Sequence, residues 1–363
     1  MSEIPPDIET LVANHFTVID VVYYPNAVEF EVEKVDPVNS REKFLELVKE
    51  LSPHGLLPKL TLDGNSLKLH VFKTSVPSRR GLRGRIILLI ATIITVILSG
   101  WVISHGTLEL LREAGISELY DPIISTVAHT LGLMIPLALH ELGHAIYMRK
   151  WGAGELELPV FIPAPPPPFG FGTFGALIIQ RKPSFNRDEL FELGISGPIF
   201  GLIPGIVVSI LGILQSHYIP ASVARTWIEQ GKAGFLPTPL IFALLENIMS
   251  RGEGVLLLSP LALAGLIILL ITFLNALPIS QLDGGHIAYA LTGSNRKLKR
   301  MGWLASIGLL FIAPVLGALM LILNAITLHP PPLDEYSLPS EKKRKWGVLA
   351  YLSILLLTFP VLQ

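Results

Sequence analysis

The stretch His140-Glu141-Leu142-Gly143-His144 lies near the end of a long apolar run from Pro122 to Tyr147. Residues four apart lie on one face of an α-helix, so His140 and His144 can present two imidazoles to one metal ion. Glu141 follows about 100° round the helix, where its carboxylate can accept a proton from a metal-bound water. The pattern H-E-x-x-H is typical of zinc hydrolases. Because ionisable groups inside a membrane span are costly and usually functional, we interpret this stretch as a metal site rather than a solvated helix end.

The composition of the chain indicates a membrane protein. Of 363 residues 50% are hydrophobic and 16% charged, and the mean hydropathy is +0.56, which predicts several membrane spans and a smaller soluble part. The net charge of −1 gives no electrostatic basis for binding nucleic acid. The chain has no cysteine, so thiol catalysis, thiolate ligands and disulfides are excluded and any metal must be bound by His, Asp or Glu. The acidic first residues lack an apolar segment, so we predict no signal peptide.

Residues 1–78 are predicted to form a soluble α+β domain. We expect strands over 16–22 and 27–35 around a turn at Tyr24-Pro25-Asn26, and a hairpin of 57–62 and 66–73. The apolar spacing over 41–51 predicts a helix that Ser40 could cap. This domain shows no catalytic constellation.

The first predicted span, 86–103, fixes the orientation of the chain. Four arginines between Arg79 and Arg85 precede it, and the positive-inside rule therefore places the N-terminal domain in the cytosol. The second span, 122–147, then runs from outside to inside. At 1.5 Å per residue, His144 lies about 8 Å and His140 about 14 Å from Arg149 along the helix. The metal pair is thus expected in the cytosolic third of the bilayer.

Four further apolar segments predict a total of about six spans: 190–214, 255–274, 302–325 and 346–359. Glycines at spacings of three and four in the third span, from Gly194 to Gly212, favour close packing against other helices. With six spans the cluster Lys342-Lys-Arg-Lys345 falls outside, against the charge rule. Between the second and third spans, 152–185 contains a proline run (163–168) followed by a glycine-rich stretch, which predicts a strand or hairpin lining a cavity. The alternative for the prolines is a polyproline ligand for a signalling domain.

A catalytic zinc requires three protein ligands and an open position. Asp283 is the best candidate for the third ligand, because it closes an inward-running span and so lies at the depth of His140 and His144. Gly284 and Gly285 follow it and allow close backbone approach. His286 is a weaker candidate.

The chain resembles the site-2 protease family of intramembrane zinc metalloproteases over about residues 85–325. The matching motifs are 140–144, Asn275-Ala-Leu-Pro278 followed by Leu282-Asp283-Gly284, and the 171–175 stretch, which is similar to a membrane-associated β loop. The resemblance implies that His140, His144 and Asp283 bind one zinc ion, that Glu141 is the general base and that Asn275 holds substrate or intermediate. We expect 169–180 to bind an unwound substrate as an edge strand, with Gly172 and Gly175 allowing close approach.

We therefore predict a polytopic α-helical membrane protein with about six transmembrane helices, an N-terminal α+β domain (1–78), a transmembrane metalloprotease domain (79–363) and a membrane-associated β loop. The expected activity is hydrolysis of peptide bonds within or near transmembrane segments in the cell membrane. The expected partners are transmembrane protein substrates and the lipid bilayer, without nucleic acid. Two alternatives are a prenyl-protein-type membrane zinc peptidase, which would use a Glu as third ligand, and a non-catalytic zinc-binding scaffold or carrier. The intact Glu141 disfavours a carrier, which needs ligands but no base.

Overall fold

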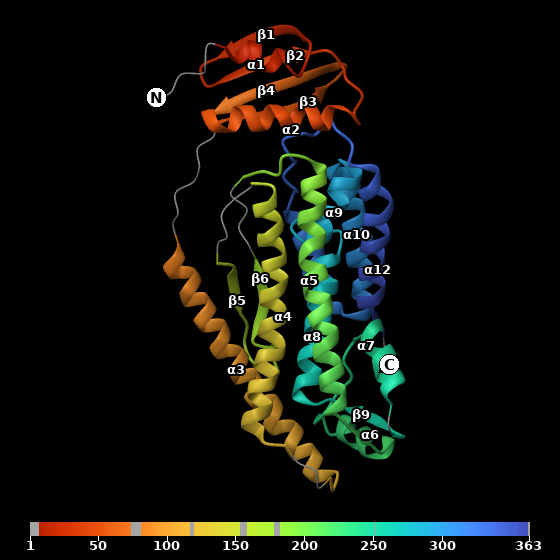
Figure 1. Cartoon of the computed structure of the whole chain (residues 1–363). Coiled ribbons are helices and arrows are strands. Elements are labelled where there is room, and N and C mark those ends of the chain that lie inside the picture. Colours follow the sequence, from red (N-terminus) through yellow and green to blue (C-terminus); the bar gives the residue numbers. More distant parts are fainter. Residues whose placement is uncertain are drawn as a thin grey trace.

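A computed structural model of the chain describes residues 7–73, 81–116, 120–152, 158–177, 182–250 and 252–361. The described part is mostly helical, with a small β-sheet region at the N-terminus (Figure 1), as predicted. Arg79 and Arg80 of the basic stretch and 178–180 of the expected substrate strand lie outside the described residues.

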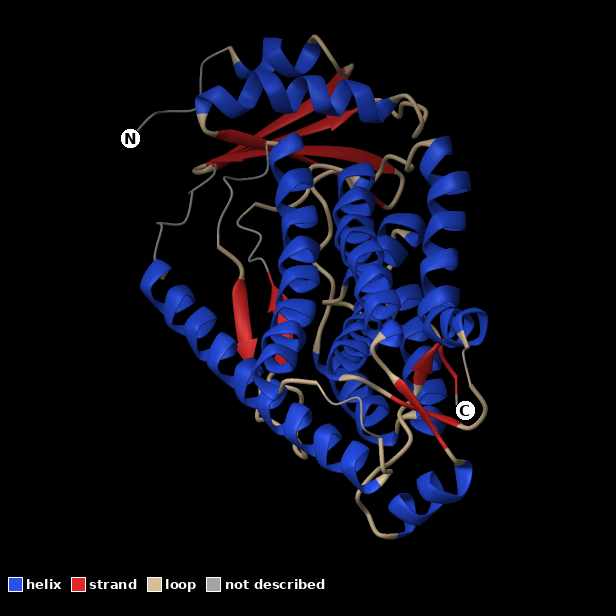
Figure 2. Cartoon of the chain, turned by 60° about the horizontal axis from the view of Figure 1, so that its bottom comes forward, coloured by secondary structure: helices blue, strands red, loops and turns tan. Residues whose placement is uncertain are grey.

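The N-terminal region is a four-stranded antiparallel sheet with the order β1-β2-β4-β3. Its strands are β1 (Val18–Tyr24), β2 (Ala27–Val32), β3 (Leu56–Asp63) and β4 (Ser66–Lys73). Helices α1 (Ile8–Ala13) and α2 (Ser40–Leu51) lie on one face (Figure 2), because alternate residues of β2 and β4, such as Val28 and Phe30, are apolar and fully buried beneath them. The predicted turn and hairpin are confirmed.

The predicted cap of α2 is wrong. The N-cap residue is Asn39, and Ser40 is the first helical residue. The Ser40 hydroxyl lies 2.7 Å from the hydroxyl of Ser337, so it contacts a distant loop instead of the first turn of its own helix.

Three described helices are long and apolar enough to cross a membrane: α3 (Leu82–Glu113), α4 (Pro122–Lys150) and α5 (Arg187–Leu214). Shorter apolar helices are α7 (Leu240–Met249), α8 (Pro260–Ala276) and α11 (Pro314–Ile326). The other helices are α6 (Ala221–Glu229), α9 (Asp283–Thr292), α10 (Asn295–Ile312) and α12 (Val348–Thr358), the last preceded by a π-helical turn, Lys343–Gly347. Helix α5 packs against both α4 and α8, which also contact each other (Figure 1), and it is the centre of the helical part.

Three short strand pairs join the helices. Strands β5 (Val160–Pro163) and β6 (Thr173–Leu177) form a hairpin around the proline run, between α3 and α4 (Figure 1). Strand β7 (His217–Ile219) pairs with β9 (Val255–Leu257), and β8 (Thr238–Pro239) pairs with β10 (Pro360–Val361). The expected fourth span therefore begins too early, because 255–257 is a strand and α8 starts at Pro260.

The prediction of a single span over 302–325 is also wrong. Pro314 lacks a backbone N–H and begins a new helix, so the chain turns back and α10 and α11 are antiparallel. Lys299 Nζ donates to the carbonyl oxygen of Ala325 over 2.9 Å. Gly302 faces Asn324 across the pair. Both outer ends of this helical hairpin therefore lie on the same side of the structure.

The helical hairpin of α10 and α11 changes the position expected for the basic cluster 342–345. Because α11 returns the chain to the level where α10 begins, the basic cluster 342–345 lies beside the N-terminal sheet region. Lys343 Nζ is 3.2 Å from Asp188 Oδ2, and Arg41 Nη1 of α2 is 3.4 Å from the same carboxylate oxygen.

The N-terminal sheet region is attached to the helical part through its edge strand β3. Leu60 N donates to the carbonyl oxygen of Leu333 over 2.8 Å, and Glu335 N donates to Leu60 over 3.0 Å. Tyr336 Oη donates to the Val35 carbonyl oxygen. Phe185 and Leu333 are part of the core under the sheet, so the helical part contributes side chains to the N-terminal region.

Candidate metal centre

Glycines of α5 make room for the two imidazoles of α4. A Cβ atom on Gly197 would lie 2.2 Å from His144 Nε2 and 2.6 Å from His140 Nε2, and one on Gly201 would lie 2.9 Å from His140 Nδ1. Such approaches are far below van der Waals contact, so only glycine fits. The glycine spacing predicted this close packing, and the structure confirms it.

Three candidate ligands meet at one point. His140 Nε2 lies 3.3 Å from His144 Nε2 and 3.1 Å from Asp283 Oδ2, and His144 Nε2 lies 3.2 Å from Asp283 Oδ1. Ligands bonded to tetrahedral zinc at 2.0–2.1 Å stand about 3.3 Å apart. The three donors therefore fit a zinc ion, although almost 140 residues separate Asp283 from the α4 pair.

Glu141 lies beside the three ligand atoms. It is 1% exposed, and one of its carboxylate oxygens lies within 4.8 Å of ligand nitrogens of both histidines. Its Oε2 atom is buried and has no hydrogen-bond partner among the described residues. A buried, unpaired carboxylate oxygen is costly in a purely structural role, and here it is available to accept a proton.

The main chain of α5 orients His144. His144 Nδ1 lies 2.9 Å from the carbonyl oxygen of Leu193, which also accepts from Ser196 Oγ over 2.8 Å. A carbonyl oxygen can only accept a hydrogen bond, so His144 Nδ1 carries the proton. The lone pair of Nε2 then faces the other two metal-ligand atoms. The sequence did not predict this contact, because every residue has a backbone carbonyl and the residue type at 193 does not reveal that it accepts a hydrogen bond.

The second motif brings Asn275 and Asp283 to the same place. Asn275, in the last turn of α8, has its Nδ2 atom 3.4 Å from His140 Nε2. Asp283 is the first residue of α9. The tight connection between them requires the two glycines that follow, because a Cβ on Gly284 or Gly285 would lie about 2 Å from a carbonyl oxygen of the connection.

Three other predicted residues lie outside this group of ligand atoms. His286, the weaker ligand candidate, has its Nδ1 atom 2.7 Å from His329 Nε2. Gly172 (φ +87°) packs against α3, where a Cβ would lie 2.7 Å from the carbonyl oxygen of Thr95. Gly175 (φ +105°) has open space at its Cβ position.

The buried His140-Glu141-His144 group lies among helices long and apolar enough to cross a membrane, as expected for a membrane-embedded metallopeptidase of the H-E-x-x-H type. A family profile described as peptidase family M50 matches residues 128–315, just over half of the chain. The chain belongs to this family of site-2 protease-type zinc metalloproteases, which confirms the resemblance seen in the sequence motifs.

Curated relatives agree with the family. The chain is 26% identical over 233 residues to a protein named Probable zinc metalloprotease EGY2, chloroplastic, of Arabidopsis thaliana, covering 62% of this chain and 40% of the relative. It is 28% identical over 232 residues to a protein of the same name from Oryza sativa subsp. indica, covering 62% and 41%. The chain thus spans about two fifths of these relatives' length. No solved structure matches the chain significantly.

Replacing Gly197 by alanine should displace the two histidine ligands directly. The added methyl group would overlap His144 Nε2 and His140 Nε2, so we expect the zinc affinity of purified protein to fall roughly 10–100-fold, the range seen when the surroundings of metal ligands are altered. Gly308→Ala is the matched control, because its Cβ position in α10 is open. Equal zinc affinities for the two variants would contradict the packing described here.

Proposed function

We propose that the protein is an intramembrane zinc endopeptidase that hydrolyses peptide bonds within or near transmembrane segments of other membrane proteins. The observation that carries this proposal is the convergence of His140, His144 and Asp283, at zinc-like separations, beside Glu141, whose Oε2 atom has no hydrogen-bond partner among the described residues. The family and the names of the relatives support it.

Each residue has a distinct part in the proposed reaction. His140, His144 and Asp283 would hold zinc, which when bound polarises the scissile carbonyl and lowers the pKa of water. Glu141 accepts the proton of the attacking water and delivers it to the leaving amine. Asn275 Nδ2 is placed beside His140 and donates to the carbonyl oxygen as negative charge develops there.

The same geometry weighs against the two alternatives. A carrier or scaffold needs ligands but no unpaired carboxylate, and Glu141 Oε2 has no hydrogen-bond partner among the described residues. A prenyl-protein-type peptidase would use a glutamate as third ligand, whereas an aspartate, Asp283, lies against both imidazoles.

We propose that α3, α4, α5, α8 and α12 cross the cell membrane and that α10–α11 enters and leaves it on the cytosolic side. The N-terminal region and the basic residues 342–345 are then cytosolic, in agreement with the positive-inside rule. The pairing of β10 with β8 supports this arrangement, because β8 lies in the segment between the outer ends of α5 and α8. The centre then lies in the cytosolic third of the bilayer.

Single cysteines test this topology cleanly, because the chain has none of its own. We expect Lys345→Cys to react with a membrane-impermeant maleimide only in inverted vesicles and Gln230→Cys only in right-side-out vesicles. Both native side chains are exposed. Labelling of Lys345→Cys in right-side-out vesicles would restore the single span over 302–325.

We also propose that β6 holds an unwound substrate. The bilayer offers no hydrogen bonds to the main chain of an opened helix. Among the described residues β6 pairs only with β5, so its other edge can bind an extended segment. Phe174 on this strand is 67% exposed and can contact substrate side chains. Gly172 is fixed against α3, so we assign substrate contact chiefly to Gly175 and Phe174.

The variant Gly175→Pro should lower cleavage at least about 10-fold while zinc content is unchanged, because proline cannot adopt a positive φ and loses the backbone N–H. Substrates with Gly or Pro near the scissile bond should be cut faster, since less helix remains to be unwound. Phe169→Ala, at the turn of the hairpin, where Phe169 is 84% exposed, is the control. A normal cleavage rate for Gly175→Pro would mean that substrate is held elsewhere.

Trapping tests the proposed activity in the native membrane. Glu141→Gln protein should retain uncleaved transmembrane proteins that wild-type protein releases, and mass spectrometry would identify them. Recovery of the same proteins in the same amounts with wild-type and variant chains would contradict proteolysis.

A further inference from the structure

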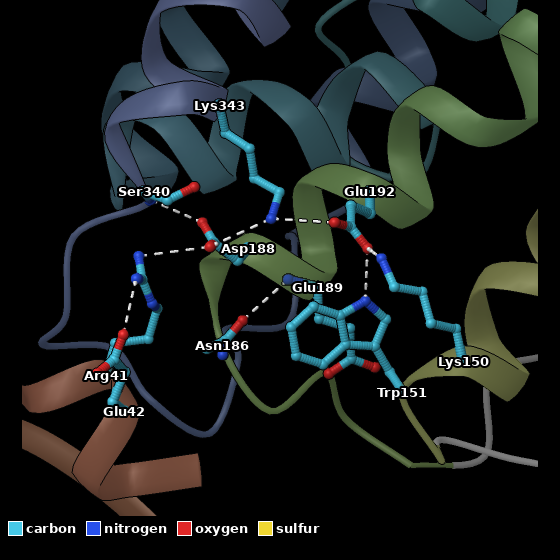
Figure 3. A network of polar contacts seen from close by, with 10 residues as sticks. All are labelled: Arg41, Glu42, Lys150, Trp151, Asn186, Asp188, Glu189, Glu192, Ser340 and Lys343. Atoms are coloured by element: carbon cyan, nitrogen blue, oxygen red, sulfur yellow. Dashed lines mark hydrogen bonds and ion pairs between the residues drawn. The ribbon is translucent and has the colours of Figure 1, made fainter.

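A cluster of charged side chains joins the cytosolic ends of α4 and α5 about two turns from the metal centre. We call Arg41, Lys150, Asp188, Glu192 and Lys343 the charge cluster (Figure 3). Glu192 is its centre. Its Oε2 atom accepts from Lys150 Nζ over 2.7 Å and from Trp151 Nε1 over 2.7 Å, and its Oε1 atom lies 3.0 Å from Lys343 Nζ.

The contacts of Glu192 join three elements. Lys150 and Trp151 end α4, Glu192 lies in the second turn of α5, and Lys343 begins the turn before α12. The Glu192 side chain is only 17% exposed and that of Lys343 18%, so solvent screens this pair less than a surface ion pair. Several charge-assisted hydrogen bonds to one carboxylate fix its position more firmly than a single pair does.

The residues directly after Glu192 contact the metal centre. The Leu193 carbonyl accepts from His144 Nδ1. Gly194 faces the backbone oxygen of Asp283, and Gly197 faces the Nε2 atoms of the histidine pair. Any shift of this stretch of α5 relative to α4 would therefore move contacts to both α4 histidines and to Asp283 together.

The two sets of contacts lie on the same pair of helices. Trp151 is seven residues, about 10 Å, beyond His144 on α4, and Glu192 precedes the Leu193 carbonyl on α5. The Glu192 contacts therefore fix the relative position of α4 and α5 where His144 needs its carbonyl partner. From this geometry we infer that Glu192 is a positioning residue for the metal centre: by binding Lys150, Trp151 and Lys343, it holds the ligand His144 in its metal-binding orientation.

The N-terminal sheet region also contacts the charge cluster. Asp188, one turn before Glu192, lies against Arg41 of α2 and Lys343, and accepts from Ser340 N over 2.8 Å. Lys343 thus bridges Asp188 and Glu192. The N-terminal region is attached to the same cluster that positions His144.

The inference rests on the proposed zinc site, and metal binding tests it without any measurement of proteolysis. We expect Glu192→Ala to weaken zinc binding roughly 10–100-fold, measured by competition with a chromophoric chelator on purified full-length protein. The visible spectrum of the Co²⁺-loaded variant should change, because it reports ligand geometry. Glu192→Gln keeps an acceptor oxygen for Trp151 and Lys150, so it should bind zinc more tightly than Glu192→Ala. Glu341→Ala, which breaks an exposed ion pair with Lys345, is the matched control.

Trp151→Phe is the second variant. It removes one hydrogen-bond donor to Glu192 and keeps an aromatic ring, so it tests the inference even if Glu192→Ala does not fold. We expect its zinc affinity to fall about 10-fold, at the lower end of the range given for Glu192→Ala. Wild-type zinc affinity and Co²⁺ spectrum in Glu192→Ala and Trp151→Phe would overturn the inference. Absence of zinc binding in the wild-type chain would instead overturn the proposed function.

Discussion

Asp283→Ala should lose its zinc. The wild-type chain is expected to hold about one zinc ion, and the variant close to none, because two imidazoles on one helix turn leave the coordination sphere one protein ligand short. Asp283 is the first residue of α9 and alanine is a good helix former, so the fold should persist. Zinc content of the purified protein, measured by mass spectrometry of the metal, gives the result directly.

Asp121→Ala is the matched control for this variant. Asp121 caps the opposite end of α4, accepting from Ile123 N over 2.7 Å, so its loss should cost about 1 kcal/mol of stability without loss of zinc. Full zinc occupancy in Asp283→Ala would remove Asp283 from the ligand set. His286→Ala would then be the next variant, despite the contact of His286 with His329.

Glu141→Gln should separate metal binding from chemistry. Glutamine has the size of glutamate but cannot accept the proton, so cleavage of a transmembrane substrate should fall about 10²–10⁴-fold while zinc content stays at the wild-type level. Cleavage and zinc content are measured on the same purified sample. Glu341→Gln, at an exposed glutamate that pairs with Lys345, serves as control. A carrier or scaffold would keep its function in the Glu141→Gln variant.

The sequence predicted the parts of the site that residue types reveal. Two histidines four apart and an apolar surrounding predicted α4 and its metal pair, and the Asn275–Asp283 motif predicted a ligand far away in the chain. The glycine spacing predicted that α5 packs closely, although only the structure shows that Gly197 lies against the imidazoles themselves. These features are local patterns with a direct physical reason, so they could be recognised without coordinates.

Other features depend on contacts between distant segments. An apolar run such as 302–325 is long enough to cross a bilayer, and only the contacts of Lys299 with Ala325 and of Gly302 with Asn324 show that it turns back at Pro314. The attachment of 333–335 to β3 consists of backbone hydrogen bonds, which no side-chain pattern encodes. The role of the Leu193 carbonyl was missed for the same reason.

Mapping the cleaved bond tests the central claim most directly. Purified wild-type protein would be reconstituted in vesicles with a single-span substrate, and the products sequenced by mass spectrometry. We predict a cut within or at the edge of the transmembrane segment that a zinc chelator abolishes, that added zinc restores and that Glu141→Gln does not make. A cut that persists in zinc-free or Glu141→Gln protein would contradict the assignment of His140, His144, Asp283 and Glu141 as a zinc peptidase centre.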